Sequence, residues 1–447
     1  MKEMSPYARP TQEIQEATGA GIPMAPRQGL GMRLCIHRGT REIGGTCVEL
    51  QAAGVRIILD LGLPLDASDP ATMPLPDVRG LTEPDASLLA IVLSHGHRDH
   101  WGLVPRVRAD IPIVMGRRAE DIMRAAADFI PDGFSPKAAA YLENGKPLQL
   151  GPFSIVPHLV DHSGFDAYAL EIEAGGRRLF YSADLRSHGR KGKLFEYMVA
   201  HPPKAIDVML MEGSSLGRLA DDAEFASEGD LERRFVEALE GTPGMALVAC
   251  SAQNIDRVVT VYRAAKRTAR TLIIDAYAAE VLKATGHDSI PKPVEGWSNL
   301  AVFIPQSQRI QLKQKGIAAL VNSYRGMRVW PEQLAEQAPR AVMLFRGWMM
   351  RDLERAGAVV GAHVIWSQWD GYLRDGPGAR LKSDCQARGI PFDVIHTSGH
   401  ASPPDLKRLA AAVAPKHLIP IHTFERDRFP ELFDNVLLVD DGQWIEV

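Results

Sequence analysis

The sequence predicts an α/β protein in which one α/β domain is inserted into another. Strand-like runs separated by turn residues fill the first part, helices and strands alternate after Glu212, and the strand-rich pattern returns near the end. A chain of 447 residues, of which 45% are hydrophobic and 24% charged, is long enough to bury more than one core. We expect domain parts over residues 32–213, 214–380 and 381–447, with the middle part inserted.

The expected elements follow in chain order. The first part should hold strands and one helical pattern, at Arg33–His37, Thr46–Gln51, Val55–Asp60, Leu88–Leu93, Arg118–Ile130 (helix), Ser154–Pro157, Ala167–Ile172, Arg178–Ser182 and Val208–Met211. The middle part should alternate helices at Leu231–Leu239 and Ile255–Arg270 with strands at Met245–Ala249, Thr271–Asp275, Ala341–Phe345 and His363–Trp366, which is typical of a parallel sheet. The last part should contain a strand at Phe392–His396, a helix at Pro404–Val413, a strand at His417–Ile421, and closing strands near Val436 and Trp444.

The N-terminus and the cysteines indicate the compartment. Residues 1–31 are rich in Pro, Gly, Ala and Gln without periodicity, so we expect a flexible leader. This segment lacks the apolar stretch of a secretory signal, and no later run reaches the roughly 18 apolar residues of a membrane span, so we expect a cytoplasmic protein. The four cysteines form no C-x-x-C pair, which favours buried thiols over disulfides or a cysteine zinc site.

The charge of the chain gives little sign of a nucleic-acid partner. The net charge is −4, whereas proteins that bind phosphate polymers usually carry a visible excess of Lys and Arg. A local basic patch formed by Arg186, Arg190, Lys191 and Lys193 is one candidate contact surface, with a solvated charged face as the alternative.

The strongest chemical signal is the run Ser94-His95-Gly96-His97-Arg98-Asp99-His100, directly after an apolar strand. Imidazole and carboxylate groups suit zinc, and the lack of a nearby cysteine favours a catalytic over a structural site. In an extended loop His95 and His97 point the same way and can bind one ion, while Asp99 and His100 can face a second. Further candidate ligands end other apolar strands, at Asp60, His162, Asp184 and His422.

Taken together, the His95-x-His97-x-Asp99-His100 set with His162, Asp184 and His422 resembles the metallo-β-lactamase superfamily, specifically its β-CASP nuclease branch. The resemblance runs from Met32 to Val447, and the branch includes ribonuclease J and the endonuclease of pre-mRNA 3′-end processing. Its fold is an αββα sandwich with an inserted α/β cap, the β-CASP domain. Glu212 and His400, in Leu210-Met211-Glu212-Gly213 and His396-Thr397-Ser398-Gly399-His400, match further motifs of the branch.

The resemblance implies a ligand set and a mechanism. One Zn²⁺ would be held by His95, His97 and His162, a second by Asp99, His100 and His422, with Asp184 between them and Asp60 orienting the ligands. Mn²⁺ is an alternative ion. A hydroxide bridging the two ions would attack phosphorus, and His400, held by Glu212, would protonate the leaving oxygen. Asp99 and Asp184 are thus expected to serve both in metal binding and in catalysis.

The resemblance also bears on the substrate. A histidine at position 422 resembles the RNA-cutting members, so we expect RNA as the substrate and keep DNA as an alternative. The other functions considered are a metallo-hydrolase of small esters or thioesters and an inactive RNA-binding scaffold. Candidate substrate contacts are His396, Ser398, Ser251, Asn254, Arg257 and Ser367; helix capping is the alternative role for Ser251 and Asn254. The sequence decides neither exonuclease versus endonuclease action nor whether the chain forms a homo-oligomer.

Overall fold

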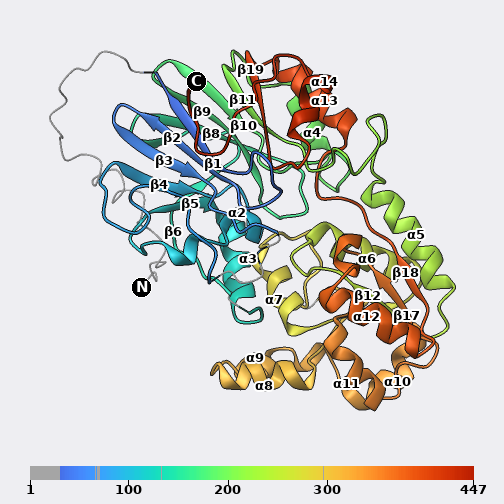
Figure 1. Ribbon diagram of the computed structural model, residues 1–447. Coiled ribbons are helices and arrows are strands. Elements are labelled where there is room, and N and C mark those ends of the chain that lie inside the picture. The colour runs from blue at the N-terminus through green and yellow to red at the C-terminus, as the bar shows by residue number, and fades with distance from the viewer. Residues whose placement is uncertain (1–30, 66, 68–70, 132, 295) are drawn as a thin grey trace.

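The structure, a computed structural model, describes residues 31–65, 67, 71–131, 133–294 and 296–447. Within these ranges the strands form three sheets (Figure 1). The leader expected over residues 1–31 lies, except for Gly31, outside the described residues. None of the helices in these ranges has the length and apolar character needed to cross a bilayer.

The first sheet runs from the closing strand back through the N-terminal strands, in the order β20-β1-β2-β3-β4-β5-β6. Its members are β20 (Trp444–Glu446), β1 (Arg33–Arg38), β2 (Cys47–Ala52), β3 (Val55–Leu59), β4 (Leu88–Val92), β5 (Ile113–Gly116) and β6 (Ala138–Leu142). The pairs from β20 to β3 are antiparallel, and those from β3 to β6 are parallel. Parallel pairing brings the carboxyl ends of β3 and β4 to the same edge of the sheet.

The second sheet has the order β19-β11-β10-β9-β8-β7. Its members are β7 (Leu148–Leu150), β8 (Phe153–Leu159), β9 (Tyr168–Ala174), β10 (Arg177–Tyr181), β11 (Val208–Glu212) and β19 (His417–Ile421). The strands β10, β11 and β19 are parallel neighbours, so their carboxyl ends also share one edge. Apolar side chains from both sheets, including Ile57, Val92, Leu170 and Leu210, form one buried core between them.

Helices cover the outer faces of this sandwich. On the first sheet lie α2 (Arg98–Trp101) and α3 (Arg117–Ala127). On the second lie α4 (Lys193–Ala200), α13 (Pro403–Val413) and α14 (Phe429–Leu432). The resulting order of layers, helix, sheet, sheet, helix, agrees with the predicted layered arrangement (Figure 1).

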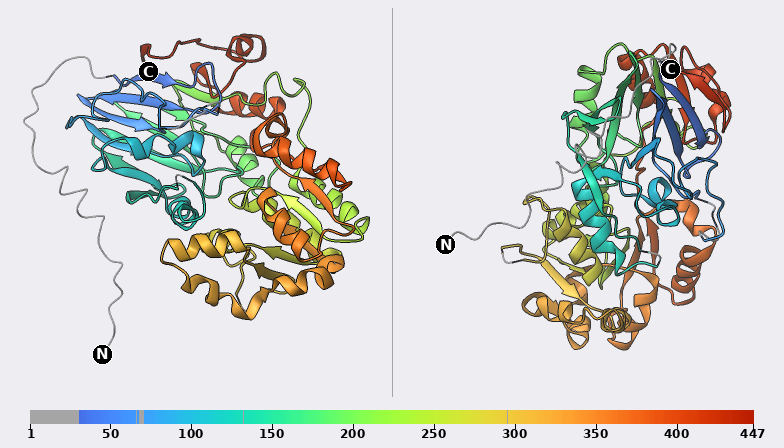
Figure 2. Two further views of the ribbon diagram at one scale, coloured as in Figure 1. Left: turned by 60° about the horizontal axis from the view of Figure 1, so that its bottom comes forward. Right: turned by 90° about the vertical axis from the view of Figure 1, so that its left-hand side faces the viewer.

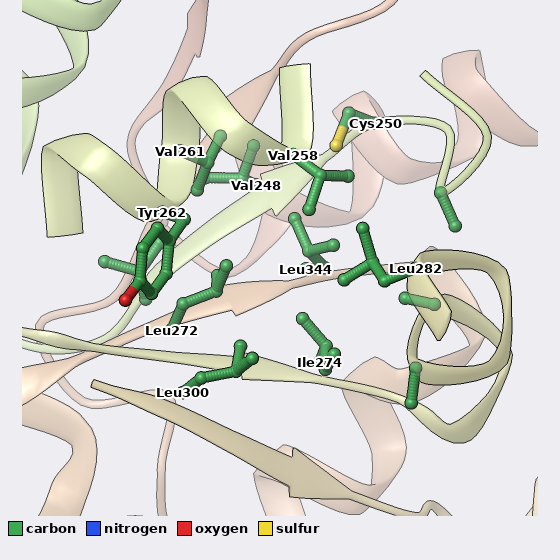
Figure 3. Close-up of a cluster of buried hydrophobic side chains, with 14 of the residues drawn as sticks. Val248, Cys250, Val258, Val261, Tyr262, Leu272, Ile274, Leu282, Leu300 and Leu344 are labelled. Carbon is green, nitrogen blue, oxygen red and sulfur yellow. The ribbon is translucent and has the colours of Figure 1, made fainter. Parts of the chain in front are cut away.

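The third sheet is entirely parallel, in the order β15-β14-β13-β16-β12-β17-β18. Its strands are β12 (Ala246–Ala249), β13 (Thr271–Ile274), β14 (Leu300–Phe303), β15 (Arg328–Val329), β16 (Ala341–Leu344), β17 (His363–Trp366) and β18 (Phe392–Val394). Its helices are α5 (Glu228–Glu240), α6 (Ile255–Arg267), α7 (Ala276–Ala284), α8 (Gln306–Gln314), α9 (Ala319–Ser323), α10 (Leu334–Gln337), α11 (Met350–Arg355) and α12 (Gly376–Ala387). Buried cores lie on both faces, and Figure 3 shows part of one of them. Burial on both faces explains why β12, β13 and β16 are almost wholly apolar.

The third sheet extends beyond the boundary predicted at residue 380. The strand β18 pairs in register with β17, Val364 opposite Phe392, and Leu381 and Cys385 of α12 lie in the third sheet's core. The prediction that placed this strand in the closing part of the chain is therefore wrong. A short apolar run does not encode which sheet it joins, because parallel pairing depends on contacts distant in sequence.

The sandwich and the third-sheet region lie side by side. In all three views the elements from α5 to α12 occupy one side of the molecule and the sandwich the other (Figure 1, Figure 2). Helix α3 of the sandwich contacts α7 of the third-sheet region, and the rings of Phe129 and Tyr277 lie 5.6 Å apart across this contact. The four cysteines are all buried and unpaired, as expected.

Candidate metal centre

The candidate site lies where parallel strands of both sandwich sheets end. Asp60 follows β3, His95 follows β4, Asp184 follows β10, Glu212 ends β11 and His422 follows β19. At three of these ends a residue other than glycine takes a left-handed backbone, with φ of 57° at Asp60, 46° at Ala183 and 54° at His422. Such a conformation costs energy in an ordinary turn and is held here by the surrounding packing. It turns the chain sharply so that each side chain faces the others.

Two groups of metal-binding side chains meet at this edge. His95, His97 and His162 form one group, and Asp99, His100, Asp184 and His422 form the other; in each group the ligand atoms lie within 4.8 Å of one another. The first group comes from the loop after β4 and the segment after β8, and α2 carries Asp99 and His100. The structure thus brings together all seven predicted ligands.

Asp184 lies between the two groups. Its Oδ2 atom is 3.1 Å from His100 Nε2, and it is 3.8 Å from Nε2 of both His95 and His422. The corresponding distance to His162 Nε2 is 3.9 Å. One carboxylate therefore faces imidazoles of both groups, as a ligand shared by two ions must.

Unsatisfied polar atoms test whether the residues fit a metal. Within the described part of the chain, His95 Nε2, Asp184 Oδ1 and His422 Nε2 are buried and have no hydrogen-bond partner. Buried polar atoms without partners cost free energy, so their presence in one cluster needs an explanation. Imidazole nitrogens and a carboxylate oxygen converging on one space are the donors that a divalent ion takes. The residues therefore fit a metal centre.

A layer of hydrogen bonds holds the ligands in orientation. The Asp60 carboxylate is fully buried and receives the Tyr181 hydroxyl at 2.6 Å, His100 Nδ1 at 2.7 Å and Ser94 N at 2.7 Å. His162 Nδ1 lies 2.7 Å from the Gly399 carbonyl. In both His100 and His162, Nδ1 forms a hydrogen bond on the side away from the site, so Nε2 is directed into the site. The prediction that Asp60 supports the ligands agrees with these contacts, whereas Tyr181 was not foreseen.

The imidazoles of the first group are held neutral. Burial, followed by the neighbouring histidines, lowers the pKa of His95 and of His162 well below the ordinary value. Burial opposes the charge on Asp184, yet the surrounding histidines outweigh it and hold the pKa of this carboxyl well below its usual range. Neutral imidazole and ionised carboxylate are the forms that bind metal ions.

His400 and Glu212 face the same space from the other side. His400 Nδ1 lies 3.3 Å from Glu212 Oε2 and 3.8 Å from Asp184 Oδ2. Burial disfavours a charged His400, but the Glu212 and Asp184 carboxylates outweigh burial and raise the pKa of His400 to about 9. Glu212 is itself fully buried and is held by the backbone N–H of Ser214 at 3.1 Å. The pair can therefore hold a proton beside the ligand groups.

Two predicted substrate contacts are buried instead. Arg257 is fully buried; its guanidinium donates to the Ser367 hydroxyl at 2.5 Å and forms an ion pair with Glu228 at 3.0 Å. Ser367 is 2% exposed, and its hydroxyl donates to the Ile395 carbonyl. Groups whose hydrogen bonds are taken up inside the protein have none left for a substrate, so the expectation of direct contact is wrong for both residues. The contact between Arg257 and Ser367 connects α6 to the segment after β17.

The other substrate candidates have mixed positions. The Asn254 side chain caps α6 by accepting the backbone N–H of Arg257 at 3.1 Å, which is the alternative role considered for it. Ser251 is exposed and accepts the Gln253 N–H at 3.2 Å. His396 and Ser398 are half-buried in the segment before His400, and the Ser398 hydroxyl accepts the His400 N–H at 3.1 Å.

A buried charge network behind the site was missed by sequence reasoning. Arg186, assigned to a surface basic patch, is fully buried, so that expectation is wrong. Its guanidinium donates to Asp161 at 3.3 Å, to Asp256 at 2.7 Å and to the Ser398 carbonyl at 2.9 Å. The network links the residue before His162, the segment before His400 and α6 of the third-sheet region. Asp161 and Asp256 lie 25 and 70 residues from Arg186 in the sequence, so only the tertiary structure shows the network.

Comparisons with known proteins show what the chain is similar to. Ribonuclease J of Mycobacterium tuberculosis is 23% identical over 440 residues, which cover 90% of this chain and 70% of the relative. Ribonuclease J of Helicobacter pylori is 19% identical over 463 residues, which cover 99% of this chain and 63% of the relative. The crystal structure of a protein of unknown function from Enterococcus faecalis V583 has the same fold, with a TM-score of 0.74 at 19% identity, covering 93% of this chain and 100% of that one. No protein-family model matches the chain.

The sequence similarity extends over nearly the whole described chain, sandwich and third-sheet region alike. The seven clustered ligands and the His400–Glu212 pair are the residues on which the resemblance noted in the sequence rests. The chain is therefore similar to ribonuclease J proteins over most of its length.

Proposed function

We propose that the protein is a zinc-dependent ribonuclease that hydrolyses phosphodiester bonds of RNA with two metal ions. The observation that supports this most directly is the pair of ligand groups around Asp184, with the His400–Glu212 pair facing the same space. The names of the relatives, which are ribonuclease J proteins, support RNA over other phosphodiesters. We further propose that the third-sheet region is the β-CASP cap and that the protein acts in the cytoplasm.

In this proposal each ligand group holds one ion. His95, His97 and His162 would hold the first, and Asp99, His100 and His422 would hold the second, with Asp184 available to both. Ions bound by these residues would supply an activated water and would offset the charge of the phosphodiester oxygens. Zn²⁺ is favoured by the imidazole-rich donor set, and Mn²⁺ remains the alternative because carboxylates also contribute.

The chain itself supplies the proton for the leaving oxygen. His400 is buried except for 19% of its side chain, so one part of the ring reaches a substrate while Glu212 and Asp184 stabilise its protonated form. The rate gain expected from such a positioned acid is about 10²- to 10⁴-fold. Glu212 acts through His400 and is a positioning residue rather than a substrate contact.

The test compares RNA and DNA oligonucleotides of one sequence, end-labelled and incubated with the pure protein, with and without a chelator. Elemental analysis of the same preparation measures zinc and manganese per chain. The proposal expects RNA cleavage that the chelator abolishes and that added Zn²⁺ or Mn²⁺ restores. Cleavage of DNA alone would overturn the assignment of RNA, and cleavage of neither would favour a scaffold or a small-ester hydrolase.

A pair of variants tests the role of His400. His400→Gln should keep its metal content while turnover falls about 10²- to 10⁴-fold. The matched control is His417→Gln, because His417 is exposed at the opposite end of β19 from His422. Normal turnover by the metal-loaded His400→Gln protein would refute the proton-donor role without touching the metal assignment.

A further inference from the structure

A cation–aromatic cluster stands at the junction of the sandwich and the third-sheet region. The guanidinium carbon of Arg218 lies 4.9 Å from the ring centroid of Trp369, and the rings of Trp369 and Tyr372 meet edge to face at 5.3 Å. Arg218 belongs to the loop after β11, whereas the aromatic residues belong to the segment after β17, which includes the short 3₁₀ helix η6 (Asp370–Leu373). We call these three side chains the aromatic rim.

Hydrogen bonds connect the aromatic rim to the metal centre. Arg218 donates to the Ser214 carbonyl at 3.3 Å. Ser214 in turn donates its N–H to Glu212 at 3.1 Å and its hydroxyl to the His422 carbonyl at 3.2 Å. The aromatic rim therefore borders the candidate catalytic space.

The two rings of the aromatic rim differ in what they can contact. A Cβ atom added at Gly371 would lie 2.4 Å from the Trp369 ring, so the Gly371 backbone packs closely against Trp369 while Arg218 lies over its ring. Trp369 is thus occupied by the protein and positions its neighbours. Tyr372, by contrast, leaves 49% of its surface exposed. Its ring is available to a ligand.

The charge of the protein bears on how an exposed aromatic side chain could contribute to nucleic-acid binding. The net charge is −4, and Arg186, one of the four residues of the predicted basic patch, is buried. Attraction to phosphates therefore contributes less to binding than in strongly basic nucleic-acid-binding proteins. Stacking of bases on aromatic side chains supplies affinity that does not depend on a large basic surface, and every base offers a face for it.

We propose that Tyr372 stacks on a nucleobase next to the scissile phosphodiester, with Trp369 positioning the ring and Arg218 adding positive charge. This inference rests on the proposed function and deepens it, because it names a side chain of the chain that contacts the bases of the substrate. Bases inside a duplex are already stacked and cannot reach Tyr372. The subsite thus selects unpaired strands by shape rather than by sequence.

The experiment pairs protein variants with RNAs that lack a single base. A set of single-stranded RNAs carries one abasic nucleotide at successive positions around the cleaved bond, and kcat/KM is measured for wild type, Tyr372→Leu and Tyr372→Phe. For wild type, loss of the stacked base should lower kcat/KM by about 5- to 150-fold at one position. On intact RNA, Tyr372→Leu should have a kcat/KM lowered by a similar factor. For this variant, removing the base should lower kcat/KM little further. Tyr372→Phe should retain most activity because it keeps the ring.

The matched control is Trp330→Leu. Trp330 is 42% exposed, and the guanidinium carbon of Arg328 lies 4.0 Å from its ring centroid, which makes a second arginine–aromatic pair. It follows β15, at the opposite edge of the third sheet from β17 and β18. This variant should show the wild-type response to every abasic RNA.

Binding is measured in parallel by fluorescence anisotropy of labelled intact, abasic and duplex RNA. If an abasic nucleotide lowers kcat/KM and affinity by the same factor for wild type and for Tyr372→Leu at every position, the inference is overturned even though cleavage persists. Equal losses for Tyr372→Phe and Tyr372→Leu would assign the effect to the hydroxyl and overturn it as well. If wild type cleaves no RNA, the proposed function fails, and binding decides the subsite: a Tyr372-dependent loss with abasic RNA supports it, and its absence overturns it.

Discussion

Replacing Arg186 by methionine should expose how strongly the buried charge network holds the site together. The guanidinium is fully buried and forms ion pairs with Asp161 at 3.3 Å and Asp256 at 2.7 Å. Methionine keeps the apolar stem but removes the charge and every donor. The loss would fall mainly on Asp161, because Asp256 keeps a second hydrogen bond from the Arg190 N–H at 3.0 Å.

The magnitude follows from burial. Removing one partner of a buried ion pair typically costs about 3–5 kcal/mol of the free energy of unfolding, because a charge remains without compensation. Burial already raises the pKa of Asp161 to about 6 even with Arg186 beside it. Without Arg186 the carboxyl would take up a proton at neutral pH, which places the expected cost toward the lower end of that range. Combining Arg186→Met with Asp161→Asn should then recover part of the loss.

Urea denaturation at neutral pH, followed by far-ultraviolet circular dichroism, measures the effect. The control is Arg388→Met, because Arg388 pairs with Glu354 at 2.6 Å on the surface, and exposed ion pairs contribute little to the free energy of unfolding. Since Arg186 also holds the Ser398 carbonyl at 2.9 Å, the variant should lose turnover as well as stability. A cost for Arg186→Met no larger than that for Arg388→Met would refute the reasoning.

Three further predictions concern the metal ligands and the pH dependence. Asp60→Asn should weaken metal affinity about 10- to 100-fold, measured by competition with a chromophoric chelator, because it disturbs the orientation of the ligands. Gly62→Ala should lower the metal content, since the added Cβ would lie 1.7 Å from the Asp99 carbonyl oxygen, whereas Gly347→Ala, with 3.8 Å to its nearest neighbour, should not. Burial and then a neighbouring arginine lower the pKa of His396 from 6.5 to about 3, so its contribution to stability is complete above pH 6.5 and is lost as the pH falls toward 3. His396→Gln should therefore flatten the acid loss of unfolding free energy in urea titrations by up to about 1.4 kcal/mol per pH unit, and an unchanged slope would contradict the assignment.

The candidate ligands were readable from the sequence for a physical reason. A histidine or aspartate directly after a short apolar strand has its position fixed by the strand, because parallel strands bring their carboxyl ends to one edge. His95, Asp184 and His422 each follow such a strand, and the structure places them around one space. His158, which lies within β8, instead pairs with Glu171 at 3.3 Å. Position at the end of a strand therefore distinguished the candidate ligands from other histidines better than sequence spacing alone.

Sequence reasoning failed where a residue's role depends on burial. Arg186 and Arg257 looked like surface cations, yet both are fully buried and bound by carboxylates from other segments. Arginine occurs both on surfaces and in buried ion pairs, and the local sequence does not distinguish them. The same limit hid the aromatic rim, since the rings and Arg218 lie in segments about 150 residues apart that meet only in the folded chain.

The sequence by itself determined the type of protein: a layered α/β fold with an inserted parallel region and a set of imidazole and carboxylate ligands at strand ends. These features are local, because strand periodicity and the residues that follow each strand are read within a few positions. The tertiary structure alone decided which charges are buried behind the site, that β18 completes the third sheet, and that Tyr372 borders the site. Those properties arise from contacts between distant segments, and no pattern along the chain specifies them.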